Sequence, residues 1–299
     1  MKISRRNNTI PIIAMLLLLS FTLVGCGGGK SPQNKAGKDT VRLVYVEWAC
    51  ATASAHVVAD VLENKMGYKV ELTPVSAPLL YEALASGDAD AMTTAWLPIT
   101  HENYLKKMQG KIENLGPNCE GAKLALTVPA YVTIDSVEEL NAKKENFGGQ
   151  IIGIDPGASY MKLTEKVINE YGLDYELVEG TDATMTAALK SAIDKNEWIV
   201  VTGWIPHWKF ARWDLKILDE PKNIYGDSEY IATIVRPGLK TDMPEVYEFL
   251  QNFKWSIDDL QNAMLLSLEY GSDSKKAAHK WTEENPELVN RWLPEKYKK

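Results

Sequence analysis

The chain has 299 residues with 33 basic and 40 acidic side chains, so its formal net charge is −7 at neutral pH. This acidic excess argues against nucleic acid or an anionic membrane surface as the binding partner. Hydrophobic residues make up 45% of the chain, which at this length is enough for one large or two medium cores.

The N-terminal segment has the pattern of an export signal. Lys2, Arg5 and Arg6 precede an almost wholly apolar run over residues 10–24. That run is too short for a comfortable transmembrane helix and has the length of a signal-peptide hydrophobic region. We therefore predict that residues 1–25 are a signal peptide. Its removal leaves 30 basic against 40 acidic side chains, a net charge near −10.

The predicted signal peptide is followed by a pattern typical of lipid attachment. Residues 23–26, Leu-Val-Gly-Cys, resemble the lipobox of bacterial lipoproteins, in which the cysteine is lipidated and becomes the first residue. Residues 26–39 are rich in Gly, Ser, Lys, Asn and Asp, a composition that suits a flexible tether. We expect a protein anchored through Cys26 on the outer face of the cytoplasmic membrane. The alternative is a plain secretory signal with a cysteine nearby.

Strand and helix patterns alternate after the tether, and a capping box of Ser136 and Glu139 predicts one further short helix. Two such series followed by a helical tail predict two α/β lobes, with the tail returning to the first. We place the first lobe at residues 40–128 plus 235–299 and the second at residues 129–234. The expected strands are 41–46, 69–73, 91–95, 123–128, 151–154, 175–178 and 198–202, and the expected helices are 52–66, 78–86, 159–171, 183–195, 243–253, 257–270 and 275–283.

Two cysteines, Cys50 and Cys119, remain outside the lipobox. An even pair in an exported chain permits a disulfide, whereas two buried free thiols are the alternative. The even number of cysteines and the predicted export are the only arguments for the bond, so both alternatives stay open at this point.

Sequence motifs of common enzyme and metal sites are absent. There is no His-Glu-x-x-His, no Cys-x-x-Cys and no Gly-x-Ser-x-Gly. Residues 29–31, Gly-Lys-Ser, look like the end of a phosphate-binding loop, but the leading glycine position holds Val24. His207 has the alternatives of a metal ligand, a base or a hydrogen-bonded structural group beside tryptophans. We predict no catalytic residue, no metal and no cofactor.

Three tryptophans follow predicted strands: Trp48, Trp96 and Trp204. In an open α/β lobe, ligands bind beyond the carboxyl ends of the strands, so we expect these three side chains to face a cleft. The alternative is that they fill a core. That second role is expected for Trp198, Trp255, Trp281 and Trp292.

A cage of indole rings suits a methylated ammonium group. Such a cation donates no hydrogen bonds, so it is held by the negative π-faces and by dispersion. A carboxylate at the other end of the same ligand requires directed donors. The glycine loop at residues 153–160 opens a predicted helix, and free backbone N–H groups at a helix start suit an anion. An ordinary tight turn is the alternative for this loop.

Four segments carry a family resemblance: Tyr-Val-Glu-Trp at 45–48, Ala-Trp-Leu-Pro-Ile-Thr-His at 95–101, Ile-Ile-Gly-Ile-Asp-Pro-Gly at 151–157 and Val-Thr-Gly-Trp-Ile-Pro-His-Trp at 201–208. Together they resemble the glycine betaine-binding lipoproteins of ABC importers, and the similarity extends from about residue 41 to the C-terminus. The resemblance implies a two-lobed α/β fold of the periplasmic-binding-protein type II, which closes about a hinge.

The resemblance also implies roles for individual residues. Family members occur with their two halves in either order, and here the half with Trp48 and Trp96 comes first. Tyr160 stands where we expect a smaller aliphatic residue, so its ring could narrow or reshape the pocket. The implied ligand-binding residues are Trp48, Trp96 and Trp204 for the ammonium group, and His101 with the backbone amides of Ser159 and Tyr160 for the carboxylate.

The resulting hypothesis is a monomeric extracellular binding protein that captures glycine betaine or a related betaine, such as proline betaine, and delivers it to the membrane permease of an ABC importer for osmoprotection. Carnitine or choline are alternative ligands. An enzyme acting on choline-like compounds is a competing hypothesis, with His101 as its only clear base, and a sensor domain is a third.

The lipid anchor has a direct test. We expect Cys26→Ala to release the protein from membranes, because no other segment of the sequence is predicted to attach it. Membrane fractionation of cells that express either form is the measurement. Unaltered membrane attachment of the variant would contradict the lipoprotein prediction.

Overall fold

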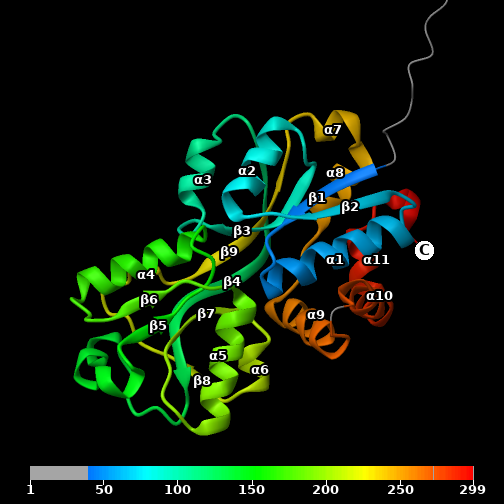
Figure 1. Cartoon of the computed structure of the whole chain (residues 1–299). Helices are drawn as coiled ribbons and strands as arrows, with labels where there is room; N and C mark the ends of the chain where they lie inside the picture. Colours follow the sequence, from blue (N-terminus) through cyan, green and yellow to red (C-terminus); the bar gives the residue numbers. More distant parts are fainter. Residues whose placement is uncertain (1–39, 272, 299) are drawn as a thin grey trace, which may run out of the picture. The chain divides into compact units, whose positions relative to one another are not determined.

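The structure, a computed structural model, describes residues 40–271 and 273–298, and the nine strands in this part of the chain pair in the order β2-β1-β3-β9-β4-β7-β5-β6, with β8 on β4 (Figure 1). The predicted signal peptide, Cys26 and tether lie outside the described residues. No helix within the described ranges is long and apolar enough to cross a membrane. The strands are β1 (Thr40–Tyr45), β2 (Lys69–Pro74), β3 (Ala91–Leu97), β4 (Glu113–Pro129), β5 (Gln150–Ile152), β6 (Glu176–Val178), β7 (Val201–Ile205), β8 (Leu215–Ile217) and β9 (Glu229–Val235).

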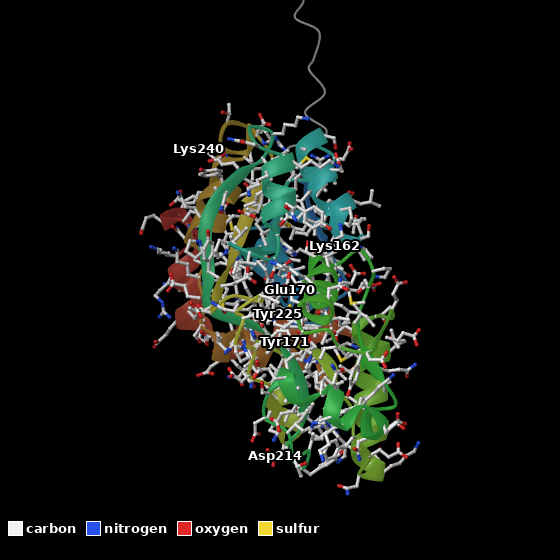
Figure 2. All side chains as sticks on the ribbon, turned by 90° about the vertical axis from the view of Figure 1, so that its left-hand side faces the viewer. Lys162, Glu170, Tyr171, Asp214, Tyr225 and Lys240 are labelled. Carbon is white, nitrogen blue, oxygen red and sulfur yellow. The ribbon has the colours of Figure 1, made fainter. Side chains whose placement is uncertain are left out.

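Two sheets share the long strand β4. Its residues 113–122 pair with β9 in the first sheet, whereas residues 123–129 pair with β7 and β8 in the second. Figure 1 shows β4 passing from the group of elements around β1 to the group around β5. In Figure 2, Lys240 on the first group and Asp214 on the second mark opposite ends. The predicted two-lobed α/β fold is confirmed, with β4 as a shared element.

The pairing of β4 slips repeatedly along the first sheet. Its register with β9 shifts between Asn114 and Pro117 and twice more before Ala122. Gly116 (φ 91°) and Gly121 (φ 84°) adopt the left-handed conformation in this stretch, which residues with a side chain rarely adopt. Bulges of this kind bend a strand and increase its twist, so one strand can leave one sheet and enter another.

Strand β9 belongs to the first sheet, because it pairs antiparallel with both β3 and β4. The sequence pattern predicts no strand there, and the predicted lobe boundary at 234/235 would assign residues 229–234 to the second lobe. All but one of the residues of β9 are buried. A strand covered on both faces lacks the polar–apolar alternation that marks a half-buried strand. The lobe boundaries themselves stay a prediction.

Helices connect the parallel strands and cover the sheets. β1 runs parallel to β2 and β3, and parallel pairs require crossovers, which are α1 and α2. The predicted capping box of Ser136 with Glu139 is present and opens the 3₁₀ helix Val137–Glu139. The α-helices are α1 (Ala49–Asn64), α2 (Ala77–Ser86), α3 (Glu102–Lys107), α4 (Ser159–Glu170), α5 (Asp182–Lys195), α6 (Lys209–Arg212), α7 (Leu239–Asp242), α8 (Pro244–Asn252), α9 (Ile257–Glu269), α10 (Ser274–Glu284) and α11 (Pro286–Trp292).

The C-terminal helices complete the first lobe, where α9 and α10 pack against α1. Trp255, Trp281 and Trp292 are buried there, and the rings of Trp281 and Trp292 stack at 6.0 Å with an interplanar angle of 8°. The predicted core role of these three tryptophans is confirmed. Trp198 is only partly buried and precedes β7, whose first residue is Val201, so the expected strand at 198–202 begins too early.

Cys50 and Cys119 are free, buried thiols, so the disulfide considered from the sequence is absent from the described structure. Cys50 lies in the first turn of α1. Cys119 lies in β4 opposite Ile231 of β9. Burial raises the pKa of each thiol to about 12, which keeps both protonated. Of the two alternatives, two buried thiols is the one observed.

We expect protein that is denatured without reductant to take up an alkyl group at both Cys50 and Cys119, because no bond joins them. In the native protein both thiols should react slowly, since they are buried and protonated. Intact mass spectrometry before and after reduction checks this. A mass that changes on alkylation only after reductant is added would show that the two are bonded.

Candidate ligand-binding site

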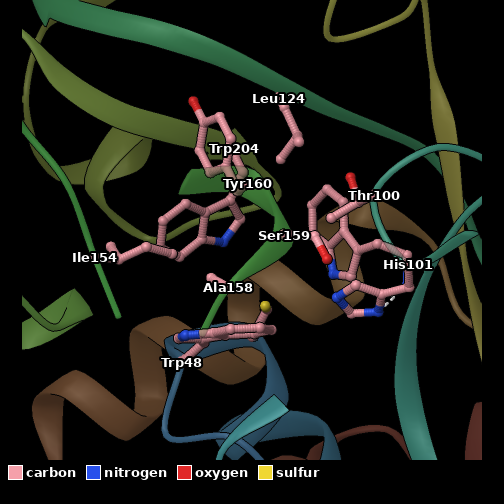
Figure 3. Close-up of a pocket in the computed structure, with 11 residues that line it drawn as sticks. Trp48, Thr100, His101, Leu124, Ile154, Ala158, Ser159, Tyr160 and Trp204 are labelled. Carbon is pink, nitrogen blue, oxygen red and sulfur yellow. Dashed lines mark hydrogen bonds between the residues drawn. The ribbon is translucent and has the colours of Figure 1, made fainter. Parts of the chain in front are cut away.

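A pocket lies where the two lobes meet, and its walls come from both. The empty volume of this pocket, with the open space at its mouth, is about 340 Å³. In the view of Figure 3, Trp48 lies below the centre, Trp204 above it and His101 to the right. The lining residues are Trp48, Cys50, Trp96, Thr100, His101, Leu124, Ile154, Ala158, Ser159, Tyr160 and Trp204. The structure thus brings all six predicted site residues to one pocket.

Each of the three tryptophans lies near the carboxyl end of a strand. Trp48 is the N-cap residue of α1 and follows β1 closely. Trp96 and Trp204 are next to last in β3 and β7, so both lie inside strands that extend further than the sequence predicts. Their exposed fractions are 7, 3 and 4%, because both lobes enclose the pocket that the rings line.

Contacts outside the pocket fix two of the indole rings. The Nε1 atom of Trp48 donates a hydrogen bond to Asp155 Oδ2 at 3.0 Å. Trp204 meets His207 edge to face, with ring centroids 4.7 Å apart. The Nζ atom of Lys209 lies 4.1 Å from the centroid of the Trp204 ring. A ring held in this way presents a defined face to a ligand.

His101 is a neutral donor. Its Nδ1 accepts the backbone N–H of Trp96 at 3.1 Å and lies 3.0 Å from the Tyr81 hydroxyl. A backbone N–H can only donate, so Nδ1 carries no proton and the neutral ring holds its proton on Nε2. Burial lowers the pKa of His101 to about 3, so the ring stays neutral at physiological pH. A neutral imidazole N–H suits an acceptor such as a carboxylate.

The start of α4 supplies further donors. Ser159 and Tyr160 are the first two residues of this twelve-residue helix, after the N-cap Ala158. The first N–H groups of a helix have no partner inside it, and the helix dipole is positive at this end. This end of the pocket therefore favours an anionic group.

The Tyr160 ring lines the pocket and is tied to β7. Its hydroxyl donates to the carbonyl of Gly203 at 2.9 Å and accepts the N–H of Gly203 at 3.0 Å. Gly203 directly precedes Trp204. Tyr160 thus anchors the strand segment that carries one of the three indoles.

A buried charged cluster lies beside Trp204. Asp182, the first residue of α5, accepts the backbone N–H of Ala49 at 2.9 Å and lies 3.1 Å from Nε2 of His207. Nδ1 of His207 accepts the N–H of Lys209, so Nε2 is the donor to Asp182. Burial opposes the charge of Asp182, but His207, Lys209 and the Ala49 N–H hold the pKa of that carboxyl below its ordinary value.

Beside the pocket, three hydrogen bonds join α1, its N-cap residue and α3 to the segments that follow β5 and β6. Two are the Trp48–Asp155 and Ala49–Asp182 bonds described above. In the third, the Tyr104 hydroxyl donates to the carbonyl of Gly157 at 2.8 Å. The lobes are therefore in contact around the pocket. Of the three tryptophans, only Trp48 takes part in these bonds.

Comparison with known proteins identifies the family of this chain. The family model described as the substrate binding domain of the ABC-type glycine betaine transport system, OpuAC, matches residues 39–284. The chain belongs to this family. The glycine betaine/carnitine transport binding protein GbuC of Listeria monocytogenes is 43% identical over 177 residues, which cover 57% of this chain and 58% of GbuC, so the match spans little more than half of that relative.

Solved structures match over most of the chain. The glycine betaine, L-proline ABC transporter binding protein ProX of Borrelia burgdorferi has a TM-score of 0.82 at 39% identity, over 86% of this chain and 98% of that one. Lactococcal OpuAC, in its closed conformation with glycine betaine, has a TM-score of 0.81 at 38% identity, over 86% of this chain and all of that one. The homologues are transport binding proteins.

Asp155, Asp182 and Lys209 contact residues at the pocket but were not predicted from the sequence. An Asp or a Lys carries no mark of burial in the sequence. Asp155 and Asp182 acquire their roles from partners distant along the chain, whereas the aromatic partner of Lys209 is nearby in sequence. His207, for which three roles were considered, is a hydrogen-bonded group in the structure. Among the described residues, no cluster of three or more His, Cys, Asp and Glu side chains could hold a metal ion.

Tyr160→Phe should lower the free energy of unfolding by about 1–3 kcal/mol, because the N–H and C=O of Gly203 lose a buried partner. Denaturant unfolding followed by circular dichroism measures this. Tyr270→Phe, at a residue that is 42% exposed, is the control and should change little. Equal stability of both variants would show that the Tyr160 hydroxyl contributes nothing.

Proposed function

We propose that the protein captures glycine betaine or a closely related betaine outside the cell and delivers it to the permease of an ABC importer. One observation carries this: indoles from both lobes, Trp48, Trp96 and Trp204, line a single pocket that also contains a neutral imidazole and the start of α4. Membership of the OpuAC family supports the same conclusion. Lipid attachment through Cys26 and a monomeric state are parts of the proposal.

The two ends of the pocket suit the two ends of a betaine. The indole faces attract a trimethylammonium group, which needs no hydrogen bonds, and each face contributes roughly 1–2 kcal/mol when water is excluded. The carboxylate accepts bonds from Nε2 of His101 and from the amides of Ser159 and Tyr160. Ligand contacts with both lobes stabilise the closed form, which the permease recognises.

We propose that the ligand leaves chemically unchanged. His101 is the only candidate base among the residues that line the pocket. Its unprotonated nitrogen, Nδ1, already accepts a hydrogen bond from the Trp96 N–H. A pKa of about 3 also makes it a weak base at neutral pH. Recovery of intact glycine betaine after long incubation with excess protein tests this; a product of its breakdown would favour the enzyme hypothesis instead.

Replacing one of Trp48, Trp96 or Trp204 with Ala should weaken glycine betaine binding by about tenfold to a hundredfold, or roughly 1–3 kcal/mol. Phe should cost less, since a weaker π-face remains. Isothermal titration calorimetry measures the affinities, and Trp198→Phe is the matched control away from the pocket. If all three Ala variants fold and bind as tightly as the wild type, the cage is wrong.

His101→Ala should weaken binding of glycine betaine but not of choline, because choline carries the same ammonium group without a carboxylate. The ratio of the two affinities is the readout, taken from titrations of wild type and variant. A parallel loss for both ligands would assign His101 to the structure of the pocket and not to carboxylate recognition.

A further inference from the structure

Lys209, the first residue of α6, is a buried lysine whose amine has no hydrogen-bond partner. Its exposed fraction is 0%, and within the described residues its Nζ is one of the few buried side-chain polar atoms that lack a partner. Lysine is almost never fully buried unless paired, since removing the ammonium from water is costly. A specific local environment must therefore offset that cost.

That environment is the indole of Trp204. Nζ lies 4.1 Å from the ring centroid, well within the range of a cation–π contact. Trp204 lines the ligand pocket, whereas Lys209 is not among the lining residues. The lysine ammonium therefore lies over the Trp204 ring without lining the pocket itself.

We propose that Lys209 sets the affinity of the pocket for cationic headgroups by acting on Trp204. The inference rests on the proposed function, in which the pocket face of Trp204 holds the ligand ammonium. The two cations are then roughly 8–10 Å apart across one ring. Like charges at this distance in a water-poor site repel each other, and both draw on the same π-electrons. Lys209 is thus a positioning and tuning residue that weakens binding and favours release.

The groups that face Lys209 are Asp182 on α5, His207 in the preceding turn and Cys50 on α1. Burial lowers the pKa of Lys209 to about 8, against the opposing effect of Asp182 and Cys50. His207 has a pKa of about 4 and Cys50 has a pKa of about 12, so both lie far from the pKa of Lys209. Between pH 7 and pH 9.5, Lys209 is therefore the member of this cluster that titrates, and its loss of a proton removes the repulsion.

Lys209→Met tests the charge, because methionine keeps an unbranched apolar chain. Glycine betaine should bind the variant roughly 5- to 20-fold more tightly at pH 7. The matched ligand is 3,3-dimethylbutanoate, in which an uncharged tert-butyl group replaces the trimethylammonium; its affinity, measured by displacement of betaine, should change far less. Lys222→Met removes the same charge from an exposed lysine over Tyr171 and should alter neither affinity.

A second arm uses the wild-type protein alone. Its affinity for glycine betaine should rise between pH 7 and pH 9.5, and calorimetry at pH 8 in buffers of different ionisation enthalpy should detect proton release on binding. A flat pH profile, or the same betaine-to-dimethylbutanoate ratio in wild type and Lys209→Met, overturns the inference alone. Failure of the wild type to bind betaine at any pH overturns the proposed function and the inference with it.

Discussion

The pocket is complete only while the two lobes are held together, because its walls are divided between two sheets. Trp48 follows β1 and Trp96 lies in β3, both strands of the first sheet, whereas Trp204 lies in β7 of the second. β4 runs through both sheets, so one strand connects the sheet near Trp48 and Trp96 to the sheet that carries Trp204. In the proposed function, a ligand that contacts both half-sites therefore stabilises the arrangement in which they meet.

Much of the architecture could be predicted from the sequence because its signals are local. Hydrophobic periodicity located most helices within two or three residues, and the Ser136 capping box was found from two side chains three positions apart. The tryptophans were recognised by their position after strand patterns, and the structure brings them to one pocket with His101. Their role toward a ligand rests on the family and on aromatic chemistry, since no ligand contact can be read from a strand pattern.

The remaining features depend on partners that are distant in the chain. β9 is recognisable as a strand of the first sheet only through its pairing with β3 and β4. Lys209 looks like a surface lysine in the sequence, because its burial against the nearby Trp204 and its proximity to Asp182, distant in the chain, appear only in the fold. The number of cysteines likewise says nothing about the distance between them. An even count permits a bond between Cys50 and Cys119, but in the structure they are free thiols on different elements.

The hydrogen bonds between the lobes affect how much ATP the proposed transport would use for each ligand carried. The bonds of Trp48 to Asp155, Ala49 to Asp182 and Tyr104 to Gly157 form between protein groups alone, so they stabilise the closed form of an empty molecule as well. Each net contribution of about 0.5–1.5 kcal/mol raises the share of closed, unloaded protein. In the proposed pathway, such molecules compete with ligand-loaded molecules for the permease. Their binding would lead to ATP hydrolysis without transport of a ligand.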